Sequence, residues 1–297
     1  MIDRRTFLIA GTAFAVACSE RPATGQNAAR GRSRASAPDF ARLRAALGEG
    51  GRLGVAALDT GSGRILSHDP DSRYAMASTF KAPLAAAILA EVEHGRLSLD
   101  RELSFTRADL VNNSPTVEAN LDRGRLSIER LCEAAIALSD NAAANLLLGQ
   151  IGGPEGLTRF ARGCGDQVTR FDRTEPALNT NIAGDPRDTT TPAAMIGLLR
   201  ALLAGDALQP ASRARMIGWM QGARTGLDRL RGGLPRDWRP GDKTGTGSGA
   251  NNDIAIAFPP GRPPILIASY TTGGNTDNAA RNAVHAEVAR LVAAAFA

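Results

Sequence analysis

Lysine is almost missing from this chain of 297 residues. Of its 35 lysine and arginine residues, only Lys81 and Lys243 are lysine, and each lies in a short polar motif. Arginine stays protonated at any working pH, whereas a desolvated lysine can lose its proton and act as a base. Codon bias and chance could explain either lysine alone, but the two together indicate chemistry that arginine cannot perform.

Aromatic residues and histidine are scarce as well. Aromatic residues make up 4% of the chain, and the arginines that produce the net charge of +5 are dispersed rather than clustered on a basic helix. Nucleic acid is therefore not an expected partner. The histidines are His68, His94 and His285, far apart and without metal-ligand spacing. We expect no metal and no cofactor, and a Ser-His-Asp triad has few candidates.

The three cysteines predict no disulfide framework. Cys132 lies on an apolar helical pattern with Leu131, Ala135 and Leu138, which favours a buried free thiol. The pattern does not decide whether Cys132 and Cys164 pair.

The first residues have the pattern of a targeting segment. Asp3–Leu8 resembles a twin-arginine export signal, and the apolar run that follows is too short to span a bilayer. We expect an export signal over 1–24, a disordered leader over 25–37, and a periplasmic or secreted mature protein. Ala15–Cys18 resembles a loose lipobox, which would make Cys18 the site of a lipid anchor.

Hydrophobic periodicity predicts an α+β fold. Strand patterns lie near both ends of the chain, and a long helical stretch separates them. The simplest architecture is a five-stranded antiparallel sheet flanked by helices, formed by 38–75 and 222–297, with an all-α domain inserted over 76–221. The expected strands are 52–59, 64–68, 239–246, 253–258 and 265–271, and the main helices are 38–48, 82–93, 127–138, 141–151, 192–203 and 278–296.

Ser78 and Lys81 form a Ser-x-x-Lys motif at the start of an apolar helix. Side chains three residues apart project from one face of a helix, so the lysine amine could take the proton of the serine hydroxyl. The unpaired N–H groups of a first helical turn could stabilise an oxyanion. Alone, the motif is also compatible with a helix cap followed by an exposed lysine.

Two further motifs follow in the chain. Ser139-Asp140-Asn141 lies between two predicted helices, and Lys243-Thr244-Gly245-Thr246-Gly247 lies in a predicted strand. Alone, the first is typical of a turn with an N-cap and the second of an edge strand before a glycine-rich turn. In this order, the three motifs match those of penicillin-binding proteins and class A β-lactamases.

A fourth element separates these two groups. Phe171–Asn179 resembles the Ω-loop of class A serine β-lactamases, with the loop predicted over 173–188. Glu175 and Asn179, four residues apart, would face the same side of a helical turn and could hold one water between them. Such a water and carboxylate are what hydrolysis of an acyl-enzyme requires. An ordinary surface glutamate at a helix start is the alternative.

The resemblance covers the chain from about Pro38 to its end and implies the catalytic roles. Ser78 would attack the lactam carbonyl, with Lys81 or Glu175 as the acylation base. Ser139 would pass a proton to the leaving nitrogen, Lys243 would tune that serine and attract the substrate carboxylate, and Glu175 would drive deacylation.

The resemblance also implies a substrate-binding set. Asn141 would bind the side-chain amide, Asn179 the hydrolytic water, and the N–H groups of Ser78 and Thr246 the oxyanion. Thr244, Gly245 and Thr246 also belong to this set, and the two threonines would bind the substrate carboxylate. Arg173 and Asp188 would form the ion pair that closes the neck of the Ω-loop.

Several positions depart from the family pattern. Asn113, an expected substrate-binding residue, stands at the cleft rim where many relatives have an aromatic ring. Asn252 stands where many relatives have an arginine that binds the carboxylate. Arg229 lies where some family members place a substitute arginine, and we expect it to supply that charge. Ala77 and Gly247 occupy the positions that a disulfide joins in some carbapenem-hydrolysing relatives, so that bridge is impossible here.

The sequence thus predicts a β-lactam hydrolase, a monomer like most of its family, with a small-molecule β-lactam as substrate. A penicillin-binding DD-peptidase or esterase is one alternative, although it would lack the water site of Glu175 and Asn179. A β-lactam sensor that stays acylated is another, although such domains are normally tethered to a transmembrane segment. The substrate spectrum is left open between penicillins, cephalosporins and carbapenems.

Overall fold

The structure, a computed structural model, describes residues 39–297. The predicted export signal, the leader and Cys18 lie outside the described residues. Every described residue belongs to one compact unit, so the division into an α/β and an all-α domain stays a prediction. Among residues 39–297, no helix combines the length and apolarity needed to cross a membrane.

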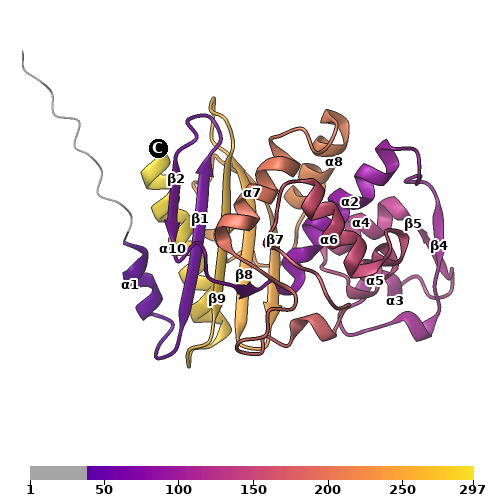
Figure 1. The fold of residues 1–297 in the computed structure, drawn as a ribbon, viewed down its shortest axis with the longest axis horizontal. Helices are drawn as coiled ribbons and strands as arrows, with labels where there is room; N and C mark the ends of the chain where they lie inside the picture. The colour runs from indigo at the N-terminus through magenta and orange to yellow at the C-terminus, as the bar shows by residue number, and fades with distance from the viewer. Residues whose placement is uncertain (1–38) are drawn as a thin grey trace, which may run out of the picture. The chain divides into compact units, whose positions relative to one another are not determined.

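A five-stranded antiparallel sheet confirms the predicted fold class (Figure 1). Its strand order is β2-β1-β9-β8-β7, so strands from the two ends of the described chain pair at its centre, with Ala56 opposite Ala268. The five strands are β1 (Arg52–Asp59), β2 (Ile65–His68), β7 (Arg239–Gly247), β8 (Ala250–Phe258) and β9 (Ile265–Thr272).

Both faces of this sheet are buried. Along β1, Ala56 and Leu58 belong to one hydrophobic cluster, while Leu53, Val55 and Ala57 belong to another. Because successive side chains of a strand point to opposite faces, this alternation means that the sheet separates two cores.

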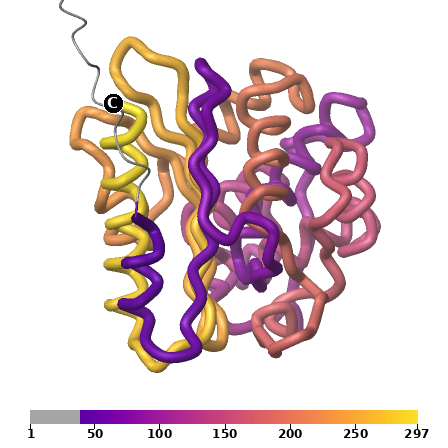
Figure 2. The backbone as a smooth tube through the Cα atoms, turned by 60° about the vertical axis from the view of Figure 1, so that its left-hand side comes forward, coloured from indigo at the N-terminus to yellow at the C-terminus, as the bar shows by residue number. Residues whose placement is uncertain are grey.

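Three helices cover the second of these faces, where α1 and α10 lie side by side (Figure 2). They are α1 (Phe40–Ala45), α9 (Leu230–Gly233) and α10 (Asn278–Phe296). The predicted helix over 38–48 is wrong in its C-terminal bound. Asp39 caps the helix by accepting from the Arg42 N–H, and the chain turns at Gly48, which has a φ of 78° and so cannot continue the helix.

The remaining helices pack on the first face and beside it. They are α2 (Lys81–Glu93), α3 (Pro115–Glu118), α4 (Ile128–Ala137), α5 (Asn141–Gln150), α6 (Gly153–Gly163), α7 (Pro192–Leu203) and α8 (Pro210–Gln221). Short strands form two small sheets, one of β3 (Tyr74–Ala75) with β6 (Thr189–Thr190) and one of β4 (Glu102–Ser104) with β5 (Arg125–Ser127). Three 3₁₀ turns complete the described elements: η1 (Ala77–Phe80), η2 (Arg107–Asp109) and η3 (Ala177–Asn179).

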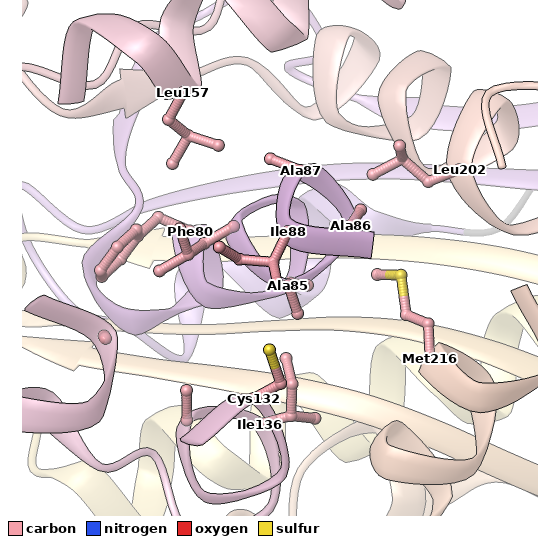
Figure 3. Close-up of a cluster of buried hydrophobic side chains, with 14 of the residues drawn as sticks. Phe80, Ala85, Ala86, Ala87, Ile88, Cys132, Ile136, Leu157, Leu202 and Met216 are labelled. Atoms are coloured by element: carbon pink, nitrogen blue, oxygen red, sulfur yellow. The ribbon is translucent and has the colours of Figure 1, made fainter. Parts of the chain in front are cut away.

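Helix α2 is the central helix of this region. Residues Lys81 to Ala90 are all buried, as expected for a helix that is apolar on every side. Side chains from α4, α6, α7 and α8 surround it, including Cys132, Leu157, Leu202 and Met216 (Figure 3). A rigid, fully packed helix therefore carries Lys81 at its first residue.

Strand β8 begins earlier than the sequence indicated. The prediction placed its start at Asp253, whereas the ladder begins at Ala250 and includes Asn251 and Asn252. All of these residues are buried. The polar run looked like a turn, but its backbone pairs with both neighbouring strands, which only the assembled sheet makes possible.

Candidate active site

Ser78 lies in a strained turn rather than in the helix itself. The sequence placed it in the first turn of α2, but it is the second residue of the 3₁₀ turn η1, directly before α2. Ala77, just before it, has a φ of 44°, a left-handed conformation that costs a non-glycine residue free energy and is typical of functional sites. The Ser78 N–H thus belongs to a first turn whose N–H groups have no partner within the helix.

Lys81 lies within hydrogen-bonding distance of the Ser78 hydroxyl. Its Nζ is 2.8 Å from Ser78 Oγ and 3.0 Å from Glu175 Oε1, and its side chain is completely buried. Nζ also donates to the Asn141 side-chain oxygen and, at 3.0 Å, to the Ser139 carbonyl. Burial lowers the pKa of Lys81 because it penalises the charged form, while the Glu175 carboxylate opposes this shift.

Ser139 stands between the two lysines. Its backbone has a φ of 57°, and its hydroxyl lies 3.0 Å from Lys243 Nζ and 3.3 Å from Lys81 Nζ. Lys243 is fully buried on β7, and burial together with the nearby charge of Lys81 lowers its pKa well below the usual value. The only two lysines of the chain therefore converge on one serine hydroxyl.

Glu175 is buried and faces Ser78. It is 3% exposed, and Ser78 Oγ donates to its Oε1 at 3.2 Å, so the alternative of a surface glutamate is wrong. Asn179 Nδ2 donates to Oε2 at 2.5 Å, which confirms that these side chains face the same side. Asn179 Oδ1 is buried without a partner among the described residues and can accept a hydrogen bond from a water.

The Ω-loop that carries Glu175 is closed by the predicted ion pair. Arg173 Nε lies 2.5 Å from Asp188 Oδ2, while Asp188 Oδ1 accepts from the Asp172 and Arg173 N–H groups. Bonds from one carboxylate to the guanidinium and to two N–H groups bring both ends of the loop together.

The β7 segment lines the other side of the cluster. A Cβ on Gly245 would lie 2.5 Å from the Met76 carbonyl oxygen, so only glycine lets β7 approach the turn before α2 this closely. Arg229 Nη2 donates to Thr246 Oγ1 at 2.7 Å. The Thr244 hydroxyl is 2.7 Å from that of Thr225.

Arg229 is held by several acceptors. Its Nη1 donates to the carbonyl oxygens of Gly245 and Asn252, and its Nε donates to Asn282 Oδ1. The Asn252 side chain turns the other way, toward the carbonyl oxygens of Ala75 and Met76. Arg229, and not Asn252, therefore presents its polar group to the segment that contains Thr246.

Asn113 is a rim residue that braces the Ser139 turn. Its φ is 60°, its Nδ2 donates to the Ser139 carbonyl oxygen at 2.8 Å, and its own carbonyl accepts from the Asn141 N–H. Asn112 accepts from Asn141 Nδ2 in the same way. Direct contact of Asn113 with substrate remains a prediction.

One residue that supports the site, Asn145, escaped the sequence analysis. Asn145 accepts from the Glu175 N–H at 3.0 Å and donates to its carbonyl at 2.9 Å, which fixes the Ω-loop to α5. Asp140 accepts from three N–H groups, those of Thr116, Val117 and Ala143. Asn145 lies four residues after Asn141 in an otherwise apolar helix, and that spacing was the available signal.

The free cysteines and the one buried histidine lie apart from this cluster. Cys132 is a buried free thiol as predicted, and Cys164 is also free. His285, on α10, is bonded to Ser269 Oγ and the Asn251 carbonyl, and burial lowers its pKa to about 3. No group of metal ligands occurs among residues 39–297.

The fold and this site together define a penicillin-recognising serine enzyme with an Ω-loop carboxylate. A family model described as the β-lactamase enzyme family matches residues 39–296. The chain is 46% identical over 256 residues to β-lactamase AST-1 of Nocardia asteroides, covering 86% of this chain and 82% of that protein. It is 42% identical to β-lactamase CTX-M-8 of Citrobacter amalonaticus, covering 87% and 89%.

Solved structures of similar proteins indicate the same family. A class A β-lactamase described as the last common ancestor of Gram-negative bacteria (GNCA4) is 56% identical and superposes with a TM-score of 0.85, covering 87% of this chain and 98% of that one. The chain belongs to the class A β-lactamases, enzymes that hydrolyse β-lactams and so confer resistance to these antibiotics.

Proposed function

We propose that this enzyme opens the β-lactam ring through an ester of Ser78 that a water activated by Glu175 then hydrolyses. The observation that carries the proposal is the convergence of Ser78, Lys81, Ser139, Glu175 and Lys243 within hydrogen-bonding distances in one buried cluster.

In acylation, Ser78 Oγ attacks the lactam carbonyl carbon and gives up its proton. Neutral Lys81 can accept that proton directly over 2.8 Å, and Glu175 is the second candidate base, acting through water. The N–H groups of Ser78 and Thr246 would stabilise the developing oxyanion.

Collapse of the tetrahedral intermediate breaks the C–N bond, and the leaving nitrogen needs a proton. Ser139 can deliver it, because its hydroxyl lies within reach of both lysine amines and can be reprotonated from Lys81. Lys243 supplies a positive charge beside this serine.

In deacylation, a water attacks the ester carbonyl while Glu175 removes its proton. Asn179 orients the carboxylate through Nδ2 and leaves its Oδ1 to accept from the water. The ester bond breaks, Ser78 regains its proton, and the opened acid leaves.

Arg229 is proposed to bind the substrate carboxylate together with Thr244, Thr246 and Lys243. We expect Arg229→Ala to raise KM for benzylpenicillin by about tenfold or more, since a charge-assisted hydrogen bond is lost. The methyl ester of benzylpenicillin, which lacks the charge, should be affected much less. Steady-state kinetics on both substrates test this, with Arg224→Ala as the control on the same loop. Equal losses on both substrates would mean that Arg229 only supports the backbone.

Nitrocefin distinguishes this function from its two alternatives. We expect steady turnover, whereas a β-lactam sensor would give one stoichiometric burst, and a DD-peptidase would release acyl groups slowly and act on D-Ala-D-Ala peptides. The Glu175 and Asn179 pair favours turnover, because it provides a carboxylate and a water acceptor facing the ester.

Class A β-lactamases are typically exported. We propose that residues 1–24 direct export to the periplasm or the medium, that Cys18 is the site of any lipid anchor, and that the mature enzyme is a monomer. Activity toward carbapenems should be low. Although a Cβ on Gly247 would lie 3.6 Å from that of Ala77, neither position has a thiol to form the bridge of carbapenem-hydrolysing relatives.

A further inference from the structure

A cavity of about 710 Å³ lies beside the Ω-loop. Its walls come from the start of β1, from β3, from the Ω-loop, and from the turns that follow β7 and β9. None of the five proposed catalytic residues lines it. Its volume falls within the range of cavities that bind small organic molecules.

Four arginines line this cavity: Arg52, Arg73, Arg173 and Arg187. Three of them are paired with carboxylates, Arg52 with Asp69, Arg173 with Asp188, and Arg187 with Asp185. These three pairs leave the fourth lining arginine, Arg73, with a positive charge that no carboxylate among residues 39–297 neutralises.

Arg73 carries that remaining charge. Its Nη1 donates to the Val168 carbonyl and to Thr189 Oγ1, and its Nη2 donates to the same carbonyl. It forms no ion pair with any residue between 39 and 297, and its Nε–H and one Nη2 N–H donate to none of them. These two N–H groups form the edge of a guanidinium that binds two oxygens of an oxyanion at once.

The cavity also has an apolar part. Ile182 is 57% exposed, which few large hydrophobic side chains among residues 39–297 are. It lines the cavity together with Ala183 and Pro186. Such an exposed apolar residue beside cationic groups suits a ligand with an apolar body.

We propose that this cavity binds a small organic molecule that carries a doubly charged oxyanion, a phosphate or a pair of carboxylates, on a compact apolar body. The oxyanion binds the open edge of Arg73 and draws Arg187 toward it. Arg73 precedes β3, whereas Arg173 and Arg187 belong to the Ω-loop, so the ligand ties the loop to the body of the protein. Asn181 already makes such a tie, donating to the Ser248 carbonyl and to Thr272 Oγ1.

Phenyl phosphate and phenylmalonate are the probes, titrated calorimetrically into the whole enzyme at constant ionic strength. We expect at least one to bind at one site, to raise the Tm saturably, and to slow amide hydrogen exchange over 173–188. Whichever binds identifies the charged group as phosphate or dicarboxylate. Arg73→Gln should weaken binding by about tenfold or more, because a bidentate charged contact is lost.

A second cavity variant and a control variant complete the experiment. Arg187→Gln, which removes contacts only to Asp185, should also weaken binding and covers the case in which Arg73→Gln fails to fold. Arg96→Gln, an exposed arginine paired with Glu91 near the end of α2, should bind as the wild type does. Absence of saturable binding by both probes, unchanged affinity in Arg73→Gln or Arg187→Gln, or competitive inhibition of nitrocefin hydrolysis would each overturn the proposal. The last result would place the anion in the active site.

Discussion

Glu175→Gln should convert the enzyme from one that turns over to one that stops as its own acyl-enzyme. Loss of the carboxylate removes the proposed acceptor for the water proton, and a positioned general base typically contributes about 10²–10⁴-fold to a rate. The deacylation rate constant should fall by that order. The side-chain volume and the hydrogen-bonding position opposite Asn179 are nearly unchanged, so folding should be preserved.

Mass spectrometry of Glu175→Gln mixed with benzylpenicillin measures the result as a mass increase on Ser78. Accumulation of this species would also show that Lys81 can support acylation without Glu175, which separates the two candidate bases. Slow acylation with no accumulated ester would instead assign Glu175 to both steps. Glu133→Gln, an exposed glutamate on α4, is the matched control, and normal turnover by Glu175→Gln would refute the deacylation role.

Lys81→Arg is expected to abolish most acylation, by on the order of 10²–10⁴-fold. Arginine keeps a positive charge but cannot lose its proton, and burial favours a neutral amine at this position. The pre-steady-state acylation rate with nitrocefin is the measurement.

The same exchange at the other lysine is the control. Lys243 is as buried as Lys81, but its proposed role requires only its charge, so Lys243→Arg should keep far more activity. If both exchanges reduce acylation equally, the loss reflects the bulk of the guanidinium and not proton transfer.

The pH dependence of kcat/KM also distinguishes the roles of Lys81 and Lys243. The pKa of Lys81 is lowered by burial, so its neutral, basic form increases as the pH rises through that pKa and acylation should rise with it. The pKa of Lys243 is also lowered, so its charge is lost as the pH rises and substrate binding should fall. In Lys243→Arg the alkaline decline of kcat/KM should move to higher pH.

Much of the sheet was predictable from the sequence because its strands are short apolar runs whose side chains are buried on both faces. The bounds of β1 and α10 agree with the prediction, since β1 is a short apolar run between turn residues and α10 a long helical pattern. The start of β8 was missed because Asn251 and Asn252 are polar, and their burial depends on β7, β9 and α10. Polarity in one segment cannot reveal partners that lie elsewhere in the chain.

The candidate site was likewise predictable from the sequence only in part. Motif spacing by itself identified the candidate side chains, because the turn that holds Ser78 and the N-cap before α5 are both short-range features of the backbone. Only the tertiary structure decided that Glu175 reaches Ser78 and that Asn145 fixes the Ω-loop.

The amino-acid sequence alone determined the family, the sheet and the two lysines that mark the site. Folding decided the proton chemistry of those lysines, because their pKa values fall only when packing removes water from around them. It also decided the open guanidinium edge of Arg73, since the groups that pair with an arginine come from distant segments and are known only once the chain is folded.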